Sequence, residues 1–205
     1  MLALLRWLGW LACVVYSTIP AFWLTIHPFA AYWRSHQRSP HRVLVPLWMA
    51  MWVVMGAITR PWRGVLLYTS WLAWLPAIAL FGCGFGIYRN AKRDFTKAQL
   101  SGLAEIRRGH PDHRLVTSGI RAHVRHPVYL GHLCEMLAWS IGTGTAVLYG
   151  LTAFAMLMGA IMIRVEDAEL EQRFGNAYRA YRQSVPAIIP CLTVYNPDAK
   201  LKADS

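Results

Sequence analysis

The sequence predicts an all-α protein, a multi-span membrane helix bundle of about five transmembrane helices with a polar site at its cytoplasmic face. Two observations predict this fold. Of the 205 residues, 56% are hydrophobic and ten are tryptophan, which is too apolar for an ordinary soluble domain of this size. The apolar residues also occur in long blocks, not in the stripe of a soluble amphipathic helix. The length suits one domain, residues 1–205.

The first part of the chain, residues 1–88, is expected to be a three-span anchor. Trp7–Ile26 carries no charge, and about 20 residues at about 1.5 Å each match a hydrocarbon core of roughly 30 Å. This run is too long for the apolar region of a cleaved signal peptide, so we expect a retained span. The second span is expected at Val43–Thr59. The third is expected at Val65–Tyr88, broken by Pro76.

A long polar segment, residues 89–127, follows the anchor. Its middle part, Ala98–Arg108, is predicted to form an amphipathic helix on the membrane surface. Its last part enters the next apolar block through the sequence LVTSGIRAHVRHPVYLG, residues 115–131. Pro127 suits the first turn of the helix that begins there, because its missing N–H is not needed at that position.

Residues 128–163 are apolar apart from Glu135 and are too long for one ordinary helix. The Gly142-Thr143-Gly144-Thr145 sequence near their middle predicts a tight hairpin between two spans. A polar, helix-forming stretch follows from Arg164 to Gln183, and prolines end it. Residues 89–190 are therefore expected to form the core that carries the site, and residues 191–205 a tail.

The basic residues predict the orientation of the bundle. The formal charge of +11 would suit nucleic acid, but Lys and Arg flanking membrane spans explain it better, so no nucleic-acid partner is expected. With five spans, 18 of the 21 Lys and Arg residues lie on one side. The positive-inside rule places that side in the cytoplasm and the N-terminus outside.

Several polar residues are candidates for chemistry. The Arg125-His126-Pro127 motif lies at a helix N-terminus, whose free N–H groups attract a carboxylate, although a plain membrane-entry motif is an alternative. Glu135 is also a candidate, because an acid inside a span is costly and is often functional. His132 lies three residues before it, on a neighbouring part of the helix face. An interhelical hydrogen bond is the alternative for that pair. The five histidines from His110 to His132 match no compact ligand spacing, so no metal site is expected.

Taken together, these motifs resemble the isoprenylcysteine carboxyl methyltransferase family and the wider group that includes the phospholipid N-methyltransferases. The resemblance covers residues 115–190 and rests on the following segments in order: LVTSG, RHPVYLG, Glu166-Asp167, Phe174-Gly175, Tyr178, Tyr181, Val185-Pro186 and Pro190.

The resemblance implies a membrane enzyme that uses S-adenosylmethionine (SAM), held between the loop before RHP and the C-terminal helix. The motifs imply these cofactor-binding residues: His113, Leu115, Val116, His126, Pro127 and Tyr129. The catalytic residues would be Glu166, the first acid of the family's pair, and Arg164, which would position a carboxylate acceptor. An amine or thiol acceptor would instead require Glu166 or His126 as a base.

Three positions differ from the prenylcysteine pattern. Arg121, Met162 and Ser184 stand where that pattern has a tyrosine, an arginine and a basic residue. The two missing cations lie on the acceptor side of the pattern and not on its SAM side. A Gly82-x-Gly84 pair resembles a cofactor motif of the phospholipid enzymes, but we expect it to serve helix packing.

The predicted activity is SAM-dependent methyl transfer to a lipophilic small-molecule or lipid-linked acceptor, an isoprenylcysteine-type carboxylate or a lipid amine, that reaches the site from membrane lipid. Two alternatives remain. One is an NADPH-dependent membrane reductase resembling the sterol reductases, which have a similar C-terminal region. The other is a non-enzymatic membrane module that keeps the same scaffold.

Overall fold

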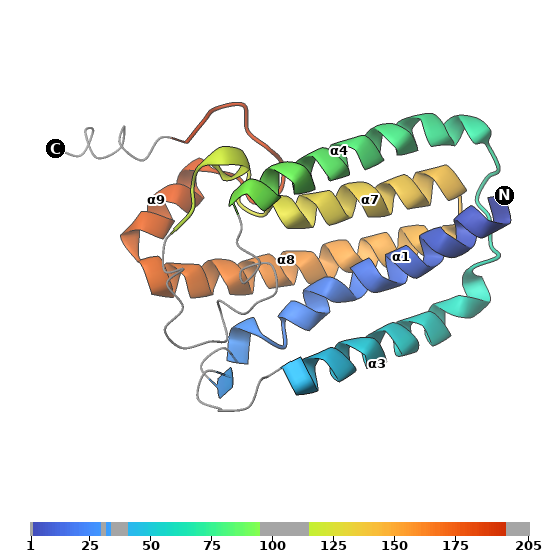
Figure 1. The fold of residues 1–205 in the computed structure, drawn as a ribbon, viewed down its shortest axis with the longest axis horizontal. Helices are drawn as coiled ribbons and strands as arrows, with labels where there is room; N and C mark the ends of the chain where they lie inside the picture. The colour runs from blue at the N-terminus through green and yellow to red at the C-terminus, as the bar shows by residue number, and fades with distance from the viewer. Residues whose placement is uncertain (1, 30–31, 34–40, 95–114, 196–205) are drawn as a thin grey trace.

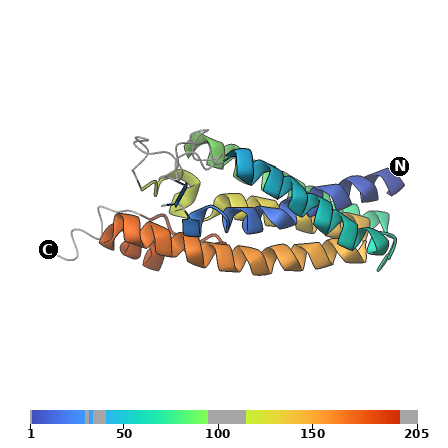
Figure 2. The ribbon, with the colours of Figure 1, turned by 90° about the horizontal axis from the view of Figure 1, so that it is seen from below.

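The computed structural model describes residues 2–29, 32–33, 41–94 and 115–195, and they form a bundle of five long helices with alternating direction (Figure 1). Helices α1, α7 and α8 contact one another, whereas α4 packs mainly on α7 and α3 on α1. The turned view shows α8 along one edge of the bundle and α3 crossing the bundle obliquely (Figure 2). The helices are α1 Leu2–Trp23, α3 His41–Thr59, α4 Trp74–Asp94, α7 Pro127–Thr143, α8 Ala146–Phe174 and the short α9 Asn176–Ser184.

Four helical segments of the described residues are long and apolar enough to cross a membrane: Leu2–Phe29, His41–Trp62, Trp71–Arg93 and Ala146–Phe174. The fifth helix of the bundle, α7, has 17 residues, or about 26 Å of helix. It lies between α4 and α8 (Figure 1). The predicted all-helical membrane bundle is confirmed, although α7 is shorter than the other four helices.

The predicted third span was wrong at its start. Residues 65–73 are not α-helical, and α4 begins only at Trp74, after the short 3-10 helix Trp71–Ala73. Leu67 N donates to Gly144 O at 2.8 Å, and Ala146 N donates to Val65 O at 2.9 Å. This backbone pairing with the α7–α8 turn holds the segment extended. Pro76 therefore lies in the first turn of α4, where it does not break the helix.

The polar stretch from Arg164 to Gln183 is helical as predicted, but it belongs to two helices. Helix α8 continues through Arg164 to Phe174, and α9 begins at Asn176. Gly175 between them has φ +57°, a left-handed conformation that interrupts the helix. The polar stretch therefore changes direction at Gly175, and α9 folds back across the end of the bundle (Figure 1).

The predicted hairpin between α7 and α8 is confirmed. Gly144 caps α7 with φ +62°, and its N–H donates to Ser140 O at 3.0 Å. A Cβ on Gly142 would lie 2.9 Å from the Trp74 ring, so this glycine lets α4 approach the turn. The hairpin places α7 and α8 side by side, and their far ends both reach the site.

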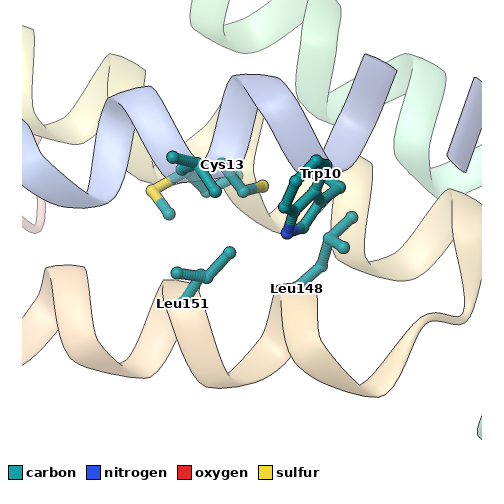
Figure 3. Packing of buried hydrophobic residues seen from close by; sticks show 6 residues of the cluster. Trp10, Cys13, Leu148 and Leu151 are labelled. Carbon is teal, nitrogen blue, oxygen red and sulfur yellow. The ribbon is translucent and has the colours of Figure 1, made fainter. Parts of the chain in front are cut away.

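The apolar core lies between α1 and α8, with Trp10 and Cys13 facing Leu148 and Leu151 (Figure 3). The α4–α7 contact uses small residues instead, because Gly84 is buried against α7. A Cβ on Gly84 would lie 3.3 Å from the Gly131 carbonyl oxygen. The packing role predicted for the glycine pair is therefore confirmed at Gly84.

Candidate active site

The candidate site lies at the end of the bundle away from the N-terminus, where the loop after residue 115 meets α9 and the segment behind it (Figure 1). Arg125 N donates to Pro186 O at 2.9 Å and His126 N donates to Ala187 O at 3.0 Å. Further along, Cys191 N donates to His123 O at 3.0 Å. The C-terminal segment therefore runs beside the loop, and the two predicted walls of the site are neighbours.

Asp167 is the centre of a buried polar network. Its side chain, 5% exposed, accepts a hydrogen bond from Arg125 Nη2 at 2.8 Å and lies 3.1 Å from His126 Nε2. The Tyr178 hydroxyl from α9 also donates to it. Arg125 further donates to the carbonyl oxygens of Arg182 and Val185. One carboxylate on α8 therefore joins the entry of α7 to α9 and to the segment that follows α9.

Glu166 approaches the same histidine from its other side. Its Oε2 lies 3.4 Å from His126 Nδ1, so the ring nitrogens of His126 face two different carboxylates. The side chain of Glu166 is 22% exposed, against 4% for His126. Glu166 is therefore the acid of the pair that a ligand can reach, and His126 holds it in place.

The two carboxylates change the pKa of His126. Burial alone would lower that pKa, but the charge of Glu166 and the hydrogen bonds to Asp167 and Glu166 raise it from 6.5 to about 9. His126 is consequently a protonated imidazolium at neutral pH, and the pair of acids is neutralised by His126 together with Arg125.

This raised pKa predicts a loss of stability at alkaline pH. Between about pH 6.5 and pH 9 the folded protein holds a proton on His126 that the unfolded chain releases, so this contribution is complete below pH 6.5 and declines as pH rises through 9. We expect the melting temperature in detergent to fall by several degrees over this window. His126→Gln should remove that dependence, and an unchanged slope in the variant would contradict the assignment.

An apolar cluster supports the network. Tyr178, Tyr181 and Val185 are buried together, and Leu115 packs against them. The Tyr181 hydroxyl donates to Arg121 O at 2.7 Å. Both tyrosines therefore pack in the core of this end of the bundle, and Tyr178 also contacts Asp167 directly.

The predicted site residues do not all come together. Pro127 is buried at the first turn of α7, and the half-buried Tyr129 ring lies 5.9 Å from the His126 ring. Val116 is half-buried beside Leu115 in the chain, and His113 lies outside the described residues. Arg164 is exposed, and two residues along a helix turn it about 200° away from Glu166. The structure therefore brings His126 and Glu166 together without Arg164.

Sequence reasoning missed Arg125 and Asp167 as the centre of this network, as well as the ion pair between His27 and Glu169. That pair links the segment after α1 to α8. Each of these residues is charged or titratable near the end of a span, which is the signal that was available. Among the described residues, no group of three His, Cys, Asp or Glu side chains is placed to hold a metal ion.

The described fold and site define a class: an integral membrane protein with a histidine–carboxylate network at one end of a helical bundle. The chain belongs to the phospholipid methyltransferase family, whose model matches residues 75–177. The matched region includes α7, α8 and all but the first residue of α4, and it contains Arg125, His126, Glu166 and Asp167 of the network. No solved structure matches the chain.

Three relatives show the range of the similarity. The chain is 38% identical over 88 residues to a protein-S-isoprenylcysteine O-methyltransferase of Schizosaccharomyces pombe, covering 40% of this chain and 35% of that protein. It is 36% identical over 105 residues to protein-S-isoprenylcysteine O-methyltransferase B of Arabidopsis thaliana, covering 49% and 48%. It is 28% identical over 193 residues to methanethiol S-methyltransferase 2 of Bradyrhizobium diazoefficiens, covering 84% and 66%. The chain thus spans half or less of the length of these two isoprenylcysteine relatives.

Proposed function

We propose that the chain transfers a methyl group from SAM to a lipophilic or membrane-accessible acceptor. The observation that carries this proposal is the Glu166–His126–Asp167 network, which joins the entry of α7 to the end of α8 inside the region matched by the family. The relatives are named as O- and S-methyltransferases, which supports the same reaction class.

The residues present fit SAM. The accessible Glu166 carboxylate suits a ribose hydroxyl or an ammonium group, because both donate hydrogen bonds to a carboxylate. His126 at the N-cap of α7 makes no side-chain capping bond, so the first-turn N–H groups of that helix suit the carboxylate of the methionyl part. Leu115, Val116, Pro127 and Tyr129, with His113, stay as the proposed lining.

In this proposal the protein mainly positions the reactants. SAM supplies a methyl group on a sulfonium that is already activated for transfer. Holding two reactants in line can lower a barrier by several kcal/mol, and in the proposed site this requires that Glu166 stay fixed. His126 and Asp167 supply that rigidity from the buried side of the site.

The position of the site at one end of the bundle also bears on the acceptor. A site at the end of a membrane bundle suits a lipophilic acceptor that arrives from lipid, and if that acceptor is a carboxylate, Arg164 is the group proposed to hold it. The distribution of basic residues supports a cytoplasmic site with the N-terminus outside, because 18 of the 21 Lys and Arg residues belong to the site side.

Ligand titration of the detergent-purified protein tests this function. SAM and S-adenosylhomocysteine should raise the melting temperature by mass action, and NADPH should not. Glu166→Ala should weaken S-adenosylhomocysteine binding at least tenfold, because it removes a charged hydrogen-bond partner. Arg164→Ala serves as the contrast, since it should keep the affinity and affect only acceptor use.

The other outcomes point to the two alternatives. Stabilisation by NADPH alone would identify a reductase, and no stabilisation by any of the three ligands would favour a non-enzymatic membrane module. Unchanged S-adenosylhomocysteine affinity in Glu166→Ala would contradict the assigned cofactor site while leaving the reaction class open to test by activity.

A further inference from the structure

A second polar cluster lies inside the bundle, away from the network at its end. Tyr16 of α1 donates a hydrogen bond to the carboxylate of Glu135 in α7. The His132 ring lies 5.0 Å from the Tyr16 ring and 5.5 Å from the Tyr88 ring, measured between centroids. Three helices, α1, α4 and α7, therefore bring two tyrosines, one histidine and one acid together.

Two polar atoms of this cluster have no partner. His132 Nδ1 and the Tyr88 hydroxyl are buried and make no hydrogen bond. Buried polar atoms are nearly always paired, and an unpaired one calls for an explanation such as a bound ligand. The Tyr16–Glu135 hydrogen bond accounts for the acid as an interhelical contact, but it leaves these two atoms unexplained.

Close helix packing builds the cluster. A Cβ on Gly131 would lie 2.7 Å from the Tyr88 ring, and one on Gly84 would lie 3.1 Å from Glu135 Cγ. The two glycines therefore let α4 and α7 approach until Tyr88 and Glu135 reach the interior. His132 is six residues from His126, about 9 Å along α7, so the cluster lies on the membrane side of the candidate SAM site.

We propose that His132, Glu135, Tyr16 and Tyr88 bind the methyl acceptor, and that this acceptor is a protic nucleophile, an amine or a thiol, and not a carboxylate. This inference rests on the proposed methyl-transfer function. Glu135 has no Lys or Arg partner within the described part of the chain, so the cluster offers a carboxylate no cation to pair with, whereas its carboxyl oxygens can accept a hydrogen bond from an N–H or S–H group.

The free nitrogen of His132 also has a role in the reaction. A bond forms between the acceptor nitrogen or sulfur and the methyl carbon. The bond from that carbon to the donor sulfur breaks and leaves its electron pair on the sulfur. The acceptor proton passes to His132 Nδ1, which has no other hydrogen-bond partner. The Tyr88 hydroxyl holds the acceptor through a hydrogen bond.

Three probes that share a six-carbon chain and differ only in their end group separate the acceptor classes. They are hexanethiol, hexylamine and hexanoate, each added with SAM to the purified full chain. We expect the thiol or the amine to be methylated at least tenfold more efficiently, by kcat/KM, than hexanoate. When S-adenosylhomocysteine replaces SAM and no methyl transfer can occur, calorimetry should show that the preferred thiol or amine probe binds and that hexanoate does not.

Conservative variants test the residues. His132→Phe keeps a ring and should lower kcat by about 100-fold or more, the usual effect of removing a general base. Tyr88→Phe should raise KM several-fold without lowering the melting temperature, because its hydroxyl has no partner to lose. Tyr149→Phe, at the hairpin end, is the control; it loses a hydrogen bond to Tyr68 and should keep both kinetic constants.

The outcomes separate this inference from the proposed function. S-adenosylhomocysteine should bind the parent and all three variants with affinities within twofold. Failure of the parent to bind it would overturn the proposed function and the acceptor site with it. Normal binding, combined with preference for hexanoate or with parent-like kinetics in His132→Phe and Tyr88→Phe, would overturn the acceptor site alone.

Discussion

Replacing Asp167 with alanine should cost about 3–5 kcal/mol of unfolding free energy, because it leaves a buried cation without its partner. Arg125 and Asp167 are 8% and 5% exposed, so water cannot replace the lost carboxylate for either the guanidinium or the neighbouring His126. Tyr178 loses its acceptor as well. The measurement is a denaturant titration in mixed micelles, with amide hydrogen exchange to locate the change.

Exchange should increase first at Arg125 and His126, whose backbone N–H groups bond to residues 186 and 187. Glu171→Ala is a matched control on the same helix, because its partners Arg179 and Arg182 are 60% and 47% exposed and solvent screens them. It should leave the melting temperature almost unchanged. Equal effects of the two variants would show that the Asp167 network does not hold this end of the bundle.

Gly144→Ala should destabilise the α7–α8 hairpin by roughly 2–5 kcal/mol, because two costs add: the strain of holding alanine in a left-handed backbone conformation and the steric overlap of its Cβ. Gly144 has φ +62°, and a Cβ there would overlap the carbonyl oxygen of Tyr68. That oxygen belongs to the backbone and cannot rotate away as a side chain would. Thermal unfolding in detergent measures the loss.

Gly150→Ala provides the comparison for this variant. Gly150 lies in α8, its φ is ordinary, and a Cβ would meet nothing within 4 Å. Alanine there should be neutral or stabilising by up to about 1 kcal/mol, because it favours the helix. A loss at Gly150 similar to that at Gly144 would mean that glycine substitutions weaken this bundle for a reason other than the turn.

Local patterns in the sequence predicted the features that depend on short stretches of chain. Uninterrupted apolar length gave the spans, and the paired glycines at 142 and 144 gave the hairpin. The motif around His126 marked the entry of α7. Each of these signals is contained within about 25 residues, so no knowledge of distant contacts was needed.

Features that depend on distant contacts were not predictable. Residues 65–73 are as apolar as a span, but their backbone pairs with the turn at Gly144, which lies far along the chain. The central role of Asp167, next to Glu166, depends on the rotation of α8 about its axis, since adjacent residues point about 100° apart. Packing of α8 against α1 and α7 sets that rotation.

The lengths of α7 and α8 set how far the candidate site lies from the α7–α8 turn. From Gly144, His126 lies 18 residues back along α7, and Glu166 lies 22 residues forward, mostly along α8; these are about 27 Å and 33 Å of helix. Both values are close to the thickness of a bilayer's hydrocarbon core, roughly 30 Å. With the turn at one membrane surface, the two side chains meet at the other. At that surface the proposed methyl donor, which is water-soluble, and the proposed lipid-dissolved acceptor would each reach the site from its own phase, and we expect the efficiency of transfer to depend on bilayer thickness.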